Sequence, residues 1–197
     1  MAYAAVQSAP PQTGMGPYTW DDFVALPDDD KRELIDGYLL EADVATEMHE
    51  YVTACLIGML WQWAQTNGGK VLAAAYKVKV TDRRGVMPDV QYYRPGRKNP
   101  AQGLTEGAPD LAVEIVSESS RRIDRVTKLR YYQQIGTPEY WLIDPEEQTL
   151  LRFVLVDSAD GMLWQTTHAL TVEDGQFAPP SFAGMTIDLQ RLFTLPE

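Results

Sequence analysis

The stretch Pro109-Asp-Leu-Ala-Val-Glu-Ile-Val-Ser117 is followed, after a helical segment, by Gly136-Thr-Pro-Glu-Tyr-Trp-Leu-Ile-Asp-Pro145. Residues 111–116 form a short apolar, β-branched run, which is typical of a strand buried on both faces. Residues 140–143 predict a second strand, and Gly136 ends the helix between them. Strand, helix and strand within about 35 residues make a βαβ unit, so we expect the two strands to be parallel neighbours.

One acidic residue, Glu114, stands in the middle of the first predicted strand. An unpaired buried carboxylate costs several kcal/mol, so Glu114 either points into a site or meets a cation in the core. Helical projection of residues 121–135 places Lys128 inside the apolar arc, with Asp124 one turn before it. The arc itself consists of Val126, Leu129, Tyr131, Tyr132 and Ile135. An ordinary Asp124–Lys128 pair on a solvated face is the competing interpretation.

The rest of the chain predicts one domain around this unit. Residues 1–17 are small, polar and proline-rich, and we expect a disordered arm there. Residues 18–197 then form a single domain, because 197 residues suffice for one sizeable core and no second boundary is visible. The predicted elements are a short helix capped by Thr19, a hairpin at 33–41 around Asp36-Gly37, a long helix at 46–66, and strands at 70–80, 86–93, 149–156 and 163–170, with a last packed segment at 185–193.

Composition limits the classes of function. The single cysteine, Cys55, excludes an intramolecular disulfide and a cysteine-clustered zinc site. No apolar run is long enough to span a membrane and no signal peptide is indicated, so we expect a cytoplasmic protein without a membrane partner.

The charge is unevenly distributed along the chain. A net charge of −11 argues against a general nucleic-acid binder. Residues 77–130, however, hold twelve of the seventeen basic residues and carry about +5, which indicates either a polyanion site or ordinary solvated charge. The nucleic-acid-binding candidates in this window are Arg84, Arg94, Arg97, Lys98, Arg121, Arg122 and Arg125.

Three charged residues lie on elements predicted to be buried: Asp89, Glu114 and Lys128. Two carboxylates on neighbouring strands repel each other unless a divalent cation bridges them, and magnesium prefers such oxygen ligands. A lysine beside the metal can orient a water or stabilise charge on a phosphate. This set is what phosphodiester hydrolysis needs, although spacing alone is a weak signal. His49 lies at the edge of the apolar face of the long helix, where a packing residue is the simpler interpretation.

The order of motifs resembles a known family. Glu33-Leu-Ile-Asp-Gly37, a histidine at the start of a long helix and Pro88-Asp-Val90 precede the 110–117 strand; Asp124, Lys128, Tyr131 and the 136–145 block follow it. Over about residues 18–193 this is similar to the Uma-type restriction endonucleases, a branch of the PD-(D/E)XK nuclease superfamily. The resemblance implies an α/β (α+β) restriction-endonuclease-like core, a mixed β-sheet flanked by helices. It also implies Mg²⁺ (or Mn²⁺) held by Asp89 and Glu114.

The chain departs from the superfamily at one position. The superfamily lysine should stand two residues after Glu114, where this chain has Val116; in this branch Lys128 matches the lysine instead. The acid on the first helix has no clean match, because Glu50 points away from the apolar stripe; His49 and Glu33 remain as supporting candidates, together with Asp124.

Two functions are consistent with these residues. The first is a Mg-dependent endonuclease that cuts DNA, with Asp89, Glu114 and Lys128 as catalytic residues and a homodimer as its expected assembly. The second is a non-catalytic module that keeps the nuclease fold and binds nucleic acid or a protein partner. An intact Asp89–Glu114–Lys128 set favours the enzyme, whereas the acidic net charge favours the module.

Overall fold

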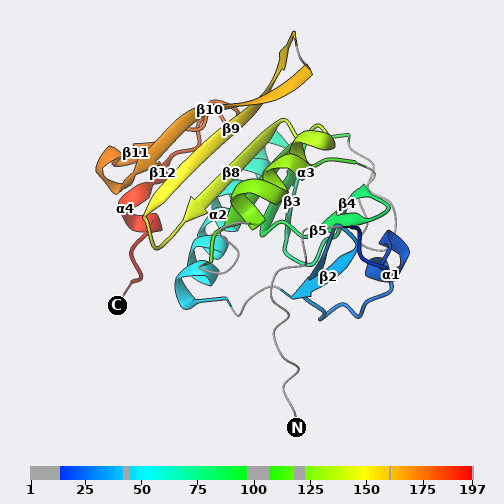
Figure 1. Ribbon diagram of the computed structural model, residues 1–197. Coiled ribbons are helices and arrows are strands. Elements are labelled where there is room, and N and C mark those ends of the chain that lie inside the picture. The colour runs from blue at the N-terminus through cyan, green and yellow to red at the C-terminus, as the bar shows by residue number, and fades with distance from the viewer. Residues whose placement is uncertain (1–13, 42–44, 97–106, 118–122, 160, 197) are drawn as a thin grey trace.

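The computed structural model describes residues 14–41, 45–96, 107–117, 123–159 and 161–196. Its central layer is a mixed six-stranded sheet in the order β10-β9-β8-β7-β6-β3 (Figure 1). A second, four-stranded antiparallel sheet has the order β2-β1-β5-β4. The strands of the central sheet are β3 (Lys70–Ala73), β6 (Val90–Tyr93), β7 (Leu111–Ile115), β8 (Glu139–Asp144), β9 (Thr149–Ser158) and β10 (Gly161–Thr171).

The predicted βαβ unit is present. Strand β7 is buried along its whole length and pairs in parallel with β8, with Glu114 opposite Leu142. The connection is helical but not uniformly α-helical: a π-helix, η1 (Ile123–Lys128), leads into α3 (Leu129–Gln134). The α-helical projection was therefore wrong for Val126, whose side chain is exposed. Hydrogen bonds of the i→i+5 type wind fewer degrees per residue than the 100° assumed.

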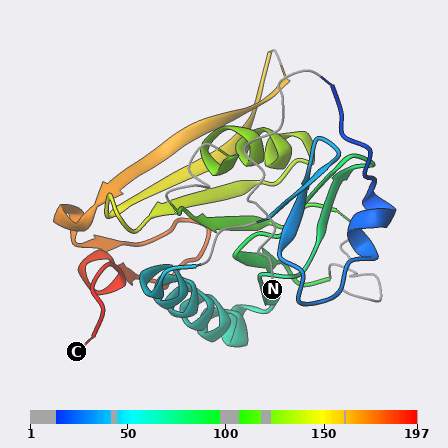
Figure 2. The same ribbon diagram turned by 60° about the horizontal axis from the view of Figure 1, so that its bottom comes forward.

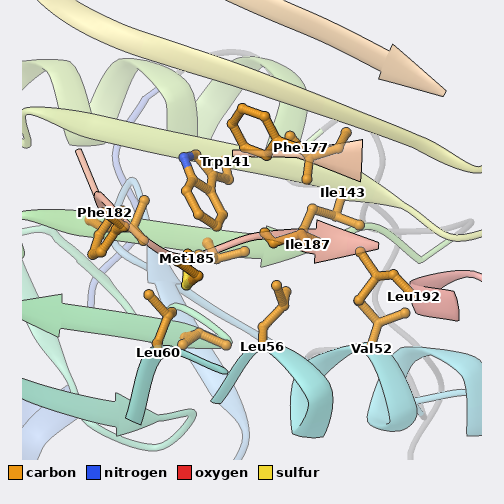
Figure 3. Packing of buried hydrophobic residues seen from close by; sticks show 14 of the residues in the cluster. Val52, Leu56, Leu60, Trp141, Ile143, Phe177, Phe182, Met185, Ile187 and Leu192 are labelled. Carbon is orange, nitrogen blue, oxygen red and sulfur yellow. The ribbon is translucent and has the colours of Figure 1, made fainter. Parts of the chain in front are cut away.

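Two layers cover the central sheet. The long helix α2 (Glu47–Asn67) packs on one face, where Val52, Leu56 and Leu60 belong to the same buried cluster as Trp141 and Ile143 (Figure 3). The C-terminal segment joins this layer through η2 (Val172–Asp174), β11 (Gln176–Phe177), β12 (Ile187–Asp188) and α4 (Leu189–Leu192). Helix α3 covers the opposite face and lies next to the four-stranded sheet (Figures 1 and 2).

The four-stranded sheet begins with the predicted helix and hairpin. Helix α1 (Trp20–Val24) starts at Thr19, whose side chain forms a capping box with Asp22. Strands β1 (Arg32–Ile35) and β2 (Tyr38–Glu41) pair around Asp36 and Gly37, both of which have positive φ. The sheet is completed by β4 (Val78–Thr81) and β5 (Arg84–Val86). Residues 1–13 of the expected N-terminal arm lie outside the described residues; Gly16 bonds to Asp36 of the hairpin.

Two predicted strands are each divided between the sheets. The expected strand 70–80 is split into β3 and β4, because the chain turns at Ala75, which has a φ of 80°. The expected strand 86–93 is split into β5 and β6 on either side of Pro88, which lacks the N–H that a ladder needs. The expectation that Asp89 lies inside a strand was therefore wrong. Asp89 stands at the junction of the two sheets, just before β6.

The mixed central sheet flanked by helices confirms the predicted fold class. Among the described residues, no helix is both long enough and apolar enough to cross a membrane.

Candidate active site

A pocket of about 440 Å³ opens where the two sheets and the start of α2 meet. Six of the residues singled out from the sequence line it: Glu33, His49, Asp89, Glu114, Asp124 and Lys128. They come from β1, α2, the β5–β6 junction, β7 and η1, so segments far apart in the chain converge here. The folded chain brings these six sequence-predicted residues together in one pocket.

Glu114 is a buried carboxylate of the pocket, with an exposed fraction of 2%. Alternation along β7 turns its side chain away from the α2 face and toward η1 and α3. Its Oε1 accepts a hydrogen bond from the Tyr132 hydroxyl at 2.6 Å, and its Oε2 accepts one from the Lys128 ammonium at 2.9 Å. Burial raises the pKa of Glu114 well above its ordinary value, although Lys128 opposes that shift. The carboxylate is costly to ionise here unless positive charge is near.

Lys128 lies at the centre of the acidic side chains. Its Nζ is 2.9 Å from Glu33 Oε2, 2.9 Å from Glu114 Oε2 and 3.3 Å from Asp124 Oδ1. Burial alone would lower its pKa, but the charges of Glu114 and Glu33 outweigh burial and raise the pKa of Lys128 well above its usual value. Lys128 is therefore a fixed cation, and the solvated-face interpretation of the Asp124–Lys128 pair is wrong. Both residues are buried in η1.

Asp89 is held at the junction by the neighbouring strand. Its Oδ2 accepts the backbone N–H of Ile115, the residue after Glu114, at 2.7 Å. His49 Nε2 lies 3.4 Å from the same oxygen. The pKa of His49 is raised because the bond to Asp89 and its charge outweigh the lowering by burial. The histidine therefore contacts a site carboxylate and is more than the packing residue that its helical position suggested.

Glu33, on the first strand of the hairpin, contacts other residues of the pocket. Its Oε1 accepts the backbone N–H of Met87 at 2.6 Å, while Oε2 contacts Lys128. Burial raises its pKa above the ordinary value, against the opposing charge of Lys128. Glu50, which was expected to point away from the core, is 70% exposed in its side chain and lies at the rim of the pocket.

The sequence did not single out Tyr132 as a site residue. It was predicted as part of the apolar arc, and it is fully buried, but its hydroxyl binds Glu114. The signal was its spacing: Tyr132 follows Lys128 by four residues and therefore lies one turn further along the same side.

The described basic candidates do not line the pocket, and each lies beside an acid. Arg84 contacts Asp36 at 2.6 Å, and Arg94 contacts Asp110 at 3.6 Å. Arg125 lies 3.0 Å from Asp144 and 2.8 Å from Glu147. The other candidates, Arg97, Lys98, Arg121 and Arg122, lie outside the described residues.

The carboxylates of the pocket suit a hard divalent cation that takes only one or two of its ligands from the protein. Within the described ranges, no three acidic, histidine or cysteine side chains are grouped as a ready-made metal cluster. Magnesium does not require one, because it commonly keeps several waters and takes one or two carboxylates together with substrate phosphates. Asp89 and Glu114 line the same pocket and keep unused oxygen lone pairs. The hydrogen bonds from Ile115 and Tyr132 are of the kind that orient metal-binding carboxylates.

Comparison with known proteins places the chain among nuclease-like folds. The model of the family Uma2, described as "Putative restriction endonuclease", matches residues 20–190. The crystal structure of a "putative nuclease belonging to DUF820" from Anabaena variabilis superposes with a TM-score of 0.74 at 21% sequence identity. That match covers 90% of this chain and 98% of the other. No curated protein matches the chain significantly.

Proposed function

The chain belongs to the Uma2 family of restriction-endonuclease-like proteins, and from this premise we propose that it is a magnesium-dependent endonuclease that hydrolyses phosphodiester bonds of DNA. The observation that carries the proposal is the convergence of Asp89, Glu114 and Lys128 on one pocket, two carboxylates and a fixed ammonium. Side chains held in place by hydrogen bonds before substrate arrives reduce the reorganisation that a reaction requires.

Each residue has a role that follows from its contacts. Asp89 and Glu114 would hold Mg²⁺ or Mn²⁺, and the bound cation supplies Lewis-acid polarisation of a phosphoryl oxygen and a more acidic water. Lys128 stays protonated and donates toward the phosphate, where negative charge increases during the reaction. Glu33 and Asp124 position the lysine, and His49 orients Asp89.

One experiment tests this function directly. Purified protein is incubated with duplex and single-stranded DNA in Mg²⁺, in Mn²⁺ and in a chelator, beside the variants Asp89→Asn and Glu114→Gln. We expect cleavage only with metal, and we expect neither Asp89→Asn nor Glu114→Gln to cleave. Asp110→Asn is the matched control, because Asp110 is a buried aspartate just before β7 that bonds Arg94 rather than the pocket. Cleavage that survives Asp89→Asn or the chelator would contradict the proposal.

The non-catalytic module is the second candidate, and the pairing of the described arginines with acids favours it. A thermal shift separates the two. Metal that raises the melting temperature of the wild type but not of Asp89→Asn supports the enzyme. If metal has no effect on either protein, the module is favoured.

A further inference from the structure

Lys31 stands directly before β1 and lies at the mouth of the pocket. Side chains alternate along a strand, so Lys31, Glu33 and Ile35 share one face, and all three line the pocket. Along that face Lys31 is exposed, whereas Glu33 and Ile35 are buried. The face therefore leads from solvent at Lys31 to the buried acid that contacts Lys128.

The residues on either side of Lys31 bind each other and leave its ammonium free. The Arg32 guanidinium donates to the Asp30 carboxylate from Nε, at 3.0 Å, and from Nη2, at 2.5 Å. The backbone N–H of Arg32 donates to the same carboxylate at 3.0 Å. In the part of the chain that the structure describes, no acid pairs with the Lys31 ammonium. Lys31 can therefore meet an incoming anion without first breaking an ion pair.

Lys128, the other described lysine that lines the pocket, is not free in this way. An ammonium group has three hydrogen-bond donors. Glu33, Glu114 and Asp124 each place a carboxylate oxygen within 3.3 Å of the Lys128 Nζ. Because its donors are matched before a substrate arrives, Lys128 contributes little to capturing one. Capture of an anion requires a second cation at the pocket, and Lys31 is suited to that role.

We propose that Lys31 binds a DNA phosphate next to the one that is cleaved and so orients the strand across the mouth of the pocket. This inference rests on the proposed function, which places the cleaved phosphate beside Glu114. Two residues of a β-strand span about 6.6 Å, so the backbone of Lys31 is displaced by that distance from Glu33 toward solvent. A lysine ammonium is a flexible point charge, which suits a backbone phosphate and reads no base.

Charge along the sequence does not single out Lys31. It follows three aspartates, Asp28 to Asp30, and it lies outside the basic window of residues 77–130. In the folded chain Asp30 is bound to Arg32, and Lys31 lines the pocket. The position of Lys31, rather than the charge of its neighbours in sequence, therefore indicates phosphate binding.

The experiment measures DNA binding first and cleavage second. Binding of a labelled duplex and of its single strand is followed by fluorescence anisotropy in a chelator, over a range of salt concentrations. Lys31→Ala should weaken binding at low salt by about threefold to fivefold, as for an exposed ion pair. The slope of log affinity against log salt should fall by about 0.9 for the duplex, or about 0.7 for the single strand, which corresponds to one phosphate contact. Lys31→Arg keeps the charge and should bind as the wild type does.

Cleavage kinetics with Mg²⁺ separate a binding role from a role in the chemical step. Lys31→Ala should raise KM and leave kcat unchanged, because the contact is equally strong in the ground state and the transition state. Lys70→Ala is the matched control: Lys70 is an exposed lysine at the start of β3 that does not line the pocket. This control should leave the affinity, the salt slope and KM unchanged. Melting curves establish that all variants are folded.

The outcomes distinguish the inference from the proposed function. An unchanged salt slope and KM in Lys31→Ala, or an equal loss in Lys70→Ala, would overturn the role of Lys31 and leave the endonuclease intact. A wild type that does not cleave DNA, but binds it with a slope that falls in Lys31→Ala, would overturn the endonuclease and support the phosphate contact. A wild type that does not bind DNA would overturn both.

Discussion

At the scale of single residues, the site contains more buried carboxylates than buried cations. Lys128 contacts three carboxylates at once, from β1, β7 and its own helix. Removing one partner of a buried ion pair leaves the other charge uncompensated, which costs more than the pair itself contributes. The lysine therefore stabilises the fold, in addition to its role in the proposed chemistry.

The first prediction follows from these contacts. Lys128→Met should lower the free energy of unfolding by about 3–5 kcal/mol in a chelator and abolish cleavage. Mg²⁺ or Mn²⁺ should restore part of the stability, because a cation near Glu114 replaces the lost charge. The matched control is Lys77→Met: Lys77 is also buried, but it bonds the neutral Phe23 carbonyl. Its stability should not respond to metal, and equal metal rescue of both variants would contradict the argument.

A second prediction concerns the tyrosine that the sequence did not single out. Tyr132 remains protonated because burial and the charge of Glu114 raise its pKa well above the ordinary value, so its hydroxyl always donates to Glu114. Tyr132→Phe should cost about 1.5–3 kcal/mol of stability, as for hydrogen bonds to charged groups. Manganese affinity, read from the thermal shift, should fall about tenfold or more.

Tyr131→Phe serves as its control, since the Tyr131 hydroxyl accepts the Asp36 N–H outside the pocket. It should leave manganese affinity unchanged. If the two variants shift the metal titration equally, Tyr132 does not position Glu114.

At the scale of elements, the βαβ unit could be predicted because its signals are local. The apolar strand runs, Gly136 and the spacing of Lys128 are all visible within about 35 residues. The division of strands between two sheets could not be predicted in the same way. Ala75 adopts a left-handed φ that neither alanine nor the neighbouring residues would predict. The sheet that a strand joins depends on contacts with residues distant in sequence. Pro88 indicated an interruption of the strand, but it did not indicate that the two halves belong to different sheets.

A third prediction concerns Ala75, where the chain passes from β3 in the central sheet to β4 in the four-stranded sheet. A left-handed φ is unfavourable for alanine and free for glycine, so Ala75→Gly should leave stability unchanged or raise it by up to about 1 kcal/mol. Ala73→Gly, two residues earlier in β3, should instead lower it by about 0.5–1 kcal/mol. Chemical denaturation of both variants measures the difference, and a loss at Ala75 as large as at Ala73 would show that the turn is not strained.

At the scale of the whole molecule, the distribution of charge along the chain could be counted from the sequence. The partners of each charged side chain in the folded structure could not be predicted from it. The basic window of residues 77–130 suggested a polyanion face. In the folded chain Lys77 and Arg83 bind backbone carbonyls, and Lys79, Arg84, Arg94 and Arg125 contact acids. These partners lie far away in sequence or across turns, so composition alone could not show that these basic side chains are already bound within the chain.

The last prediction rests on the proposed function and tests which arginines would bind DNA. The affinity should fall with salt by about 0.9 logarithmic units per phosphate contact for each tenfold rise in salt concentration. Arg84→Ala and Arg125→Ala should leave this slope unchanged, because their guanidinium groups already face Asp36, Asp144 and Glu147. Arg121→Ala with Arg122→Ala should reduce it by about 2, as expected for two lost contacts. Binding is measured with metal replaced by a chelator, so that cleavage does not interfere. A slope that falls in the first pair and not in the second would place the DNA beside Arg84 and Arg125 and would contradict this prediction. A slope near zero in the wild type would remove the polyanion interpretation altogether and leave a pocket whose acids serve a different substrate.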